Sequence, residues 1–121
     1  MTPAETGRQA EAMAAEILRA KGYRLLARNY SAKTGELDLV MRDGGCIVFV
    51  EVRARRAGAM VAPVETVDVR KRNKLIRTAY DYLMRNPSTL QPRFDLFLVK
   101  TSGDDPRRWV WEHLPNAFDA G

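Results

Sequence analysis

The chain has 121 residues, of which 45% are hydrophobic and 29% are charged, and its formal net charge is +5. These values predict one globular domain, residues 1–121, with a single hydrophobic core. They exclude a membrane helix, because no apolar run approaches about 20 residues. With no signal-peptide pattern at the start, we expect a cytoplasmic protein with no membrane partner. The single Cys46 excludes an internal disulfide and a cysteine-based zinc cage.

The first predicted element is a helix over residues 3–21. Thr2 has a side chain suited to the N-cap, a proline follows at the first helical position, and Glu5 completes a capping box. The helix should end at Gly22. Glu11 lies at the edge of the apolar stripe and by itself indicates a solvated helix residue. That stripe is formed by residues at three- and four-residue spacing: Ala10, Met13, Ala14, Ile17 and Leu18.

Basic residues alternate with tyrosines in the stretch after this helix. Residues 23–27 are predicted to form a short first strand, and residues 28–30 to turn into a loop that contains Lys33. The mixture of Tyr23, Tyr30 and basic side chains suits phosphate contact and base stacking. Packing of the tyrosine rings at the rim of the core is the alternative.

Two apolar-rich runs, residues 36–41 and 46–53, flank a Gly-Gly pair and predict a β-hairpin. A two-residue loop of Gly44 and Gly45 places charged side chains opposite each other on one face: Asp38 with Glu51, and Glu36 with Arg53. The other face is then apolar and predicts core, through the pairs Leu37–Val52, Leu39–Val50 and Met41–Val48. A three-residue loop would put the carboxylates on different faces. The shorter loop is favoured because neither face then mixes aliphatic side chains with charges.

Directly opposed carboxylates repel, so such a pair needs a shared proton, a cationic side chain or a metal ion. One interpretation is ordinary ion pairing of Glu36 and Glu51 with Arg53 on a solvated face. The other is a site for Mg²⁺ or Mn²⁺, with oxygen ligands from Asp38 and Glu51. The residues alone favour ion pairing, since structural ion pairs are commoner than metal sites.

Basic residues dominate the next two predicted segments. Residues 53–60 should form a mobile loop beside the carboxylates, where Arg55 and Arg56 would meet a DNA backbone. A second helix is predicted from residue 69 to 86, capped by Asp68. Cations crowd its first half against the helix dipole, which points to a partner, and Lys71 and Lys74 on one face are predicted to bind nucleic acid.

Two strands complete the predicted order. Residues 93–99 carry apolar side chains on both faces, as in a central strand, and Asp95 is expected to pair with Arg93 or a helix lysine. Residues 109–114 should form an edge strand, in which His113 is a surface or packing residue rather than a ligand. The predicted fold is therefore α/β (α+β), with a mixed central sheet of about five strands flanked by helices in the order α-β-β-β-α-β-β.

The chain also carries an ordered set of short motifs between residues 7 and 118. They are GRQAE (7–11), RNY (28–30), GELDLV (35–40), VFVEVR (48–53) and RFD (93–95). This set resembles the YraN-like family, a bacterial family related to archaeal Holliday-junction resolvases. Asp38 with Glu51-Val52-Arg53 also resembles the D…(D/E)-x-K signature of restriction-endonuclease-like nucleases. The resemblance implies that fold and a metal-dependent endonuclease acting on DNA, on branched or single-stranded structures, in a homodimer.

The resemblance also implies roles for individual residues. Glu36 would orient Arg53. The ligands of one or two Mg²⁺ or Mn²⁺ ions would be Asp38, Glu51, the Val52 carbonyl and Glu11. Arg53 departs from the family pattern, because active relatives have lysine there. Arginine stays protonated and cannot act as a base, although it can steady an attacking water or transition-state charge.

That departure leaves two alternatives to a nuclease. One is a catalytically degenerate nucleic-acid-binding module on a nuclease scaffold. The other is an interaction protein whose basic surface meets an acidic protein.

Overall fold

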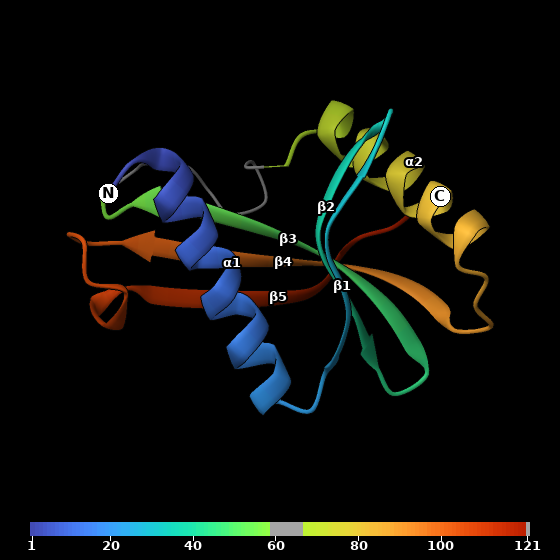
Figure 1. Ribbon diagram of the computed structural model, residues 1–121, viewed down its shortest axis with the longest axis horizontal. Helices are drawn as coiled ribbons and strands as arrows, with labels where there is room; N and C mark the ends of the chain where they lie inside the picture. Colours follow the sequence, from blue (N-terminus) through green and yellow to red (C-terminus); the bar gives the residue numbers. More distant parts are fainter. Residues whose placement is uncertain (59–66, 121) are drawn as a thin grey trace.

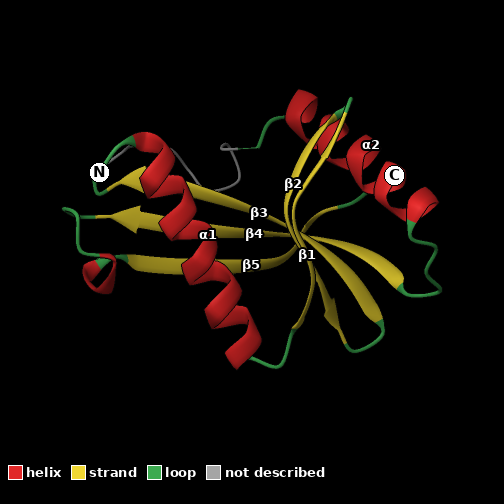
Figure 2. Cartoon of the chain, in the orientation of Figure 1, coloured by secondary structure: helices red, strands yellow, loops and turns green. Residues whose placement is uncertain are grey.

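The computed structural model describes residues 1–58 and 67–120. Two helices flank a five-stranded mixed sheet, so the predicted α+β class and element order are confirmed (Figures 1 and 2). A short 3-10 helix, η2, was not predicted. No helix among the described residues is long and apolar enough to cross a membrane. The elements are α1 Pro3–Ala20, β1 Arg24–Ala32, β2 Gly35–Asp43, β3 Cys46–Arg56, α2 Val69–Arg85, β4 Gln91–Thr101, η2 Pro106–Arg108 and β5 Val110–Phe118.

The strands are ordered β1-β2-β3-β4-β5 across the sheet. Neighbours are antiparallel except β3 and β4, which run parallel. A parallel pair needs a crossover, and α2 lies in that connection (Figure 1). The β1–β2 hairpin rises beside α2, while α1 crosses the other face of the sheet (Figure 1).

Two apolar clusters hold these layers together, one on each face of the sheet. The predicted stripe of α1 is confirmed, since Ala10, Ala14 and Leu18 are buried with Met13 and Ile17 packed beside them. On the sheet side this cluster contains Leu39, Met41, Val48, Val50, Phe97, Val99 and Trp109. The α2 cluster contains Leu37, Val40, Ile47, Phe49, Val67, Leu75, Ala79, Tyr82, Phe94 and Leu96. Because both faces are buried, the strands can be apolar on both sides.

The predicted helix ends are confirmed at α1. Glu5 N donates to Thr2 Oγ1 at 3.2 Å and Thr2 N donates to Glu5 Oε1 at 3.3 Å, which completes the capping box. Gly22 follows the helix with φ 101°, a conformation that glycine adopts without strain. Asp68 caps α2 as predicted and accepts a hydrogen bond from Lys71 N.

The predicted register of the β2–β3 hairpin is confirmed. Asp43 pairs with Cys46 and Leu39 with Val50, across a two-residue loop. Only the first loop glycine, Gly44, has positive φ (55°), as in a type II′ turn. Gly45 does not have a positive φ, so its backbone conformation does not require a glycine.

Three predicted ladder pairs of this hairpin do not form: Leu37–Val52, Asp38–Glu51 and Glu36–Arg53. The β2–β3 ladder ends at Leu39–Val50, and Leu37 pairs instead with Tyr30 of β1 and packs in the α2 cluster. Asn29 of β1, just before Tyr30, has a left-handed backbone (φ 50°). This local irregularity in β1 accompanies the change of face at Leu37.

All five predicted strands were too short, and three of them ended at least three residues too early. β1 continues through residues 28–30, β5 reaches Phe118, and β3 runs to Arg56 instead of opening into a loop at residue 53. The pairing of β3 with β4 continues from Arg53–Leu98 to Arg56–Thr101. The backbone N–H and C=O groups of this basic segment therefore find hydrogen-bond partners in a neighbouring strand. The rest of the predicted loop includes residues 59 and 60, which lie outside the described residues.

Both tyrosines near β1 pack at the core rim, which is the alternative to base stacking. Tyr30 meets the Tyr82 ring edge-on at 5.1 Å between centroids and donates a hydrogen bond to Asp81. Tyr23 joins a polar network at the opposite side of the sheet. Their hydroxyl groups are thus used within the protein.

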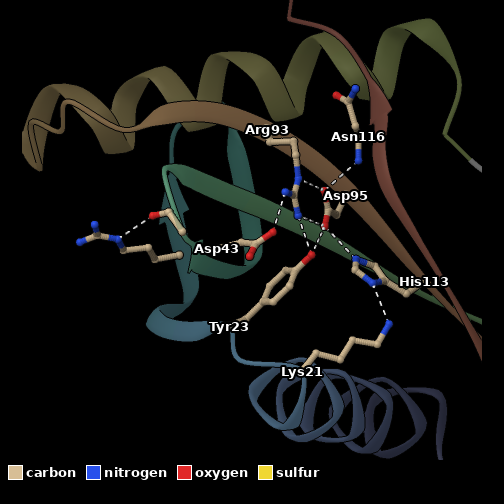
Figure 3. Close-up of polar contacts among 9 residues, drawn as sticks. Lys21, Tyr23, Asp43, Arg93, Asp95, His113 and Asn116 are labelled. Carbon is tan, nitrogen blue, oxygen red and sulfur yellow. Dashed lines mark hydrogen bonds and ion pairs between the residues drawn. The ribbon is translucent and has the colours of Figure 1, made fainter.

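The centre of that network is Asp95, which is completely buried (Figure 3). Arg93 donates to both of its carboxylate oxygens at 2.9 Å, which confirms the predicted ion pair, and donates to Asp43 at 2.8 Å. His113 lies 2.8 Å from Asp95, with its side chain 4% exposed, so it is a packing residue and not a surface residue. Because Lys21 Nζ can only donate to His113 Nδ1, His113 carries its proton on Nε2 and donates to Asp95.

Candidate functional site

The carboxylates of Asp38 and Glu51 lie side by side where β2 separates from β3. Asp38 Oδ2 accepts a hydrogen bond from Val52 N at 2.8 Å, which holds it against β3 beyond the last ladder pair. The Glu51 side chain is only 9% exposed. Burial, and then a hydrogen bond with Asp38, raise the pKa of Glu51 to about 9. Glu51 therefore keeps its proton at neutral pH.

Two further carboxyl groups lie in the same electrostatic environment. Burial first, and then the charges of Asp38 and Glu36, raise the pKa of Glu11 on α1 to about 7 against the opposing effect of Arg28. Glu36 itself is exposed. Glu11 follows the fully buried Ala10, so the packing of α1 on the sheet is what brings its carboxyl group near the hairpin. The prediction of a solvated helix residue is therefore wrong for Glu11, which is partly buried.

The carboxyl groups do not converge on a single point. Among residues 1–58 and 67–120, no three His, Cys, Asp or Glu side chains come close enough together to hold a metal ion as a set. The pair of Asp38 and Glu51 nevertheless fits a hard cation in its donor chemistry, because both side chains supply carboxylate oxygens and Glu51 holds a proton that a cation could replace. Glu11 lies near this pair without completing a three-carboxylate set.

Arg53 lies close to the pair without forming the predicted ion pairs. In the described part of the chain, neither Glu36 nor Glu51 is within ion-pair distance of it, although its charge partly offsets the rise in the pKa of Glu51. Its Nε is buried and has no hydrogen-bond partner among the described residues. The cation that reaches Glu51 is Lys71 of α2, whose Nζ lies 3.6 Å from Glu51 Oε2.

An open pocket of about 440 Å³ joins the carboxylates to the basic half of α2. Five of the predicted site residues line it: Glu36, Asp38, Glu51, Lys71 and Lys74. The other predicted nucleic-acid contacts, Lys33, Arg55 and Arg56, are exposed but are not among its lining residues. The structure thus gathers the carboxylates and both helix lysines around one opening.

Comparison with known proteins places the chain in a family. Residues 10–99 match the family described as "Uncharacterised protein family UPF0102". The chain is 43% identical to a UPF0102 protein of Ectopseudomonas mendocina over 96% of both chains. It is 47% identical to a UPF0102 protein of Stutzerimonas stutzeri over 95% of both chains. The chain belongs to the UPF0102 family. This confirms the resemblance to the YraN-like family.

Sequence reasoning missed several residues around the pocket of this UPF0102 protein. Arg70 and Thr78 line it from α2, and Gly35 lines it from the start of β2. Thr78 Oγ1 lies 2.9 Å from Thr34 Oγ1, which ties the β1–β2 turn to α2. Arg70 could have been found from the run of cations that begins α2, whereas the threonine contact spans 44 residues and has no local signal.

Another missed cation lies next to the predicted Arg55. Lys100 of β4 pairs with Arg55 in the parallel ladder, and both side chains are exposed. Side chains of paired residues share a face of the sheet. The basic surface of β3 therefore extends onto β4, which only the strand register reveals.

Proposed function

We propose that this UPF0102 protein is a nucleic-acid-binding, metal-dependent endonuclease that hydrolyses DNA phosphodiesters, with branched, Holliday-junction-like DNA as a candidate substrate. The observation that carries the proposal is the placement of Asp38 and Glu51 side by side in a pocket that the basic half of α2 also lines. Carboxylate oxygens suit Mg²⁺ or Mn²⁺, and the adjacent cations suit a phosphate backbone.

Each part of the pocket has a role in this proposal. Asp38 and Glu51 would hold the metal, which when bound supplies an activated water and neutralises charge on phosphorus. Lys71 and Lys74 attract the phosphate backbone of the substrate. Arg53 carries a permanent positive charge beside Glu51 and would stabilise transition-state charge, but it cannot remove a proton.

The test is a calorimetric Mn²⁺ titration, with and without a short four-way DNA junction. Wild-type protein is expected to bind Mn²⁺, and Asp38→Asn to bind it far more weakly while keeping its affinity for the junction. Asp119→Asn is the matched control, because Asp119 is exposed and does not line this pocket. Cleavage of the junction in Mg²⁺ is then compared for the same variants. Cleavage that survives Asp38→Asn would contradict the proposal.

A catalytically degenerate nucleic-acid-binding module is the second candidate. It is favoured by Arg53 at the position of a lysine and by the lack of a three-carboxylate set in the described part of the chain. It predicts DNA affinity that falls steeply with salt and does not change when divalent metal is removed. Affinity that is indifferent to salt would exclude it.

A further inference from the structure

Lys71 has a fixed backbone and an adjustable side chain. Its N–H donates to Asp68 Oδ1 at 2.9 Å in the first turn of α2, so its Cα position is set by the helix cap. Its side chain reaches to 3.6 Å from Glu51 Oε2 and remains 36% exposed, against 9% for Glu51. A flexible four-carbon stem lets the ammonium group change partners without moving the helix.

The other cations around the pocket differ from Lys71. Arg70 and Lys74 line the same pocket, yet within the described residues neither forms an ion pair with Asp38 or Glu51. Arg53 has its Nε buried, which restricts the movement of its guanidinium group. Lys71 is therefore the cation in this part of the structure that both contacts a site carboxylate and can leave it.

We propose that Lys71 is a tethered counter-ion, which balances the negative charge of the Asp38–Glu51 pair in the metal-free protein and moves to a substrate phosphate when a divalent cation binds. This inference rests on the proposed function. A divalent cation on the Glu51 oxygens would repel an ammonium group 3.6 Å away, and the pocket that Lys71 lines is open to solvent. Metal binding thereby releases Lys71 for a phosphate, and the two binding events reinforce each other.

The first measurement is Mn²⁺ affinity by calorimetry for wild type, Lys71→Gln and Lys74→Gln. Lys71→Gln removes a competing cation and is expected to bind Mn²⁺ about two- to fivefold more tightly than wild type, the range typical of one partly exposed ion pair. Lys74→Gln removes the same charge three residues along α2 and should change the affinity less. Lys71→Arg keeps the charge and should resemble wild type, which separates the counter-ion from packing effects.

The second measurement is affinity for a four-way junction with and without Mn²⁺. In wild type, Mn²⁺ should raise this affinity by a factor that Lys71→Gln reduces about two- to fivefold, because coupling between two ligands is reciprocal. If Lys71→Gln and Lys74→Gln bind Mn²⁺ equally, while Asp38→Asn loses binding, the counter-ion role is overturned and the metal site stands. If wild type shows no Asp38-dependent Mn²⁺ binding, both proposals are overturned.

Discussion

Glu51 is a carboxyl group in a place where ionisation is unfavourable. Burial is the main cause and the neighbouring Asp38 the second, and together they raise the pKa of Glu51 to about 9. The folded protein therefore holds a proton that the unfolded chain releases above pH 4.5. Unfolding free energy must then fall as pH rises from about 5 to 9, since the unfolded state binds fewer protons across that window.

Replacing Glu51 with glutamine should remove much of this pH dependence. In chelator, we expect Glu51→Gln to be about 1–3 kcal/mol more stable than wild type at pH 8, because the glutamine does not have to take up a proton when the chain folds. At pH 5, where Glu51 is already neutral in the folded protein, the difference should be small. Urea unfolding at both pH values measures the effect, and Glu16→Gln, an exposed change on α1, is the control. Equal stabilities at pH 8 would contradict the assigned cause.

The adjacency of Asp38 and Glu51 could be predicted from the sequence because a two-residue turn determines the register near it. The expectation behind the two-residue loop, that charged side chains and buried aliphatic side chains lie on different faces of the hairpin, is wrong. Phe49 and Glu51 alternate with Val50 and so lie on the same face, which α2 covers only in part. The contact of Lys71 with Glu51 could not be predicted, since it depends on how α2 crosses the sheet.

At the scale of elements, the helix ends were predictable because caps are local. Strand lengths were not, because pairing between β3 and β4 extends a basic segment that has no strand pattern of its own. The change of face at Leu37 occurs where β2 has left β3 and pairs only with β1, opposite a stretch in which Asn29 has a left-handed backbone. Local patterns thus locate the elements, and tertiary pairing determines where they end.

Gly35 marks the point where β2 meets α2. Its φ is 148°, and a Cβ there would lie 3.2 Å from Thr78 Oγ1, which is hydrogen-bonded to Lys74 O. We expect Gly35→Ala to lower the unfolding free energy by about 1–2 kcal/mol through backbone strain and this close contact. Gly45→Ala, with no atom within 4 Å of the added Cβ, is the control for thermal unfolding. An equal loss of unfolding free energy in both variants would mean that Thr78 moves aside at no energetic cost and that the close contact is not destabilising.

The first half of α2 should contribute more to DNA affinity than its end. Lys74 is exposed at the pocket, so Lys74→Gln is expected to weaken DNA binding about three- to tenfold at low salt. The slope of log affinity against log salt should decrease by about 1. Arg85→Gln, which removes a cation paired with Asp81 at 3.3 Å in the last turn, is the matched control. Similar losses in both variants would indicate attraction by net charge alone.

Across the whole molecule, the network around Asp95 joins segments that are far apart in the chain. Tyr23 precedes β1, Asp43 ends β2, and His113 lies on β5, yet each contacts Arg93 or Asp95 of β4 (Figure 3). These contacts have sequence separations of 18–70 residues, so they cannot be predicted from hydrophobic periodicity or turn residues, which are local patterns. None of these network residues lines the carboxylate pocket, whose lining comes from β2, β3 and α2. The network can therefore affect the pocket only by holding β2 and β3 in place in the sheet.

Asp95→Asn tests whether this network holds the sheet together. Burial alone would raise the pKa of Asp95, but hydrogen bonds from Arg93, Asn116 N and His113 outweigh it and lower the pKa. The stabilisation is therefore present at neutral pH and is lost only as pH falls below about 4. Asp95→Asn removes the buried charge that Arg93 and His113 contact, leaves Arg93 with Asp43 as its remaining carboxylate partner, and should lower the unfolding free energy by about 3–5 kcal/mol at pH 7.

Thermal unfolding at pH 7 and pH 3 measures this loss. The gap between wild type and Asp95→Asn should be wide at pH 7 and narrower at pH 3, where wild type begins to lose the same charge. Asp104→Asn removes an exposed carboxylate that pairs with the N-terminal amine at 3.2 Å, and it should cost less than about 1 kcal/mol. If Asp95→Asn is no more harmful than this control, apolar packing alone holds β4 and β5 in place. If it is far more harmful, the charge on Asp95 is part of what holds the five strands in register.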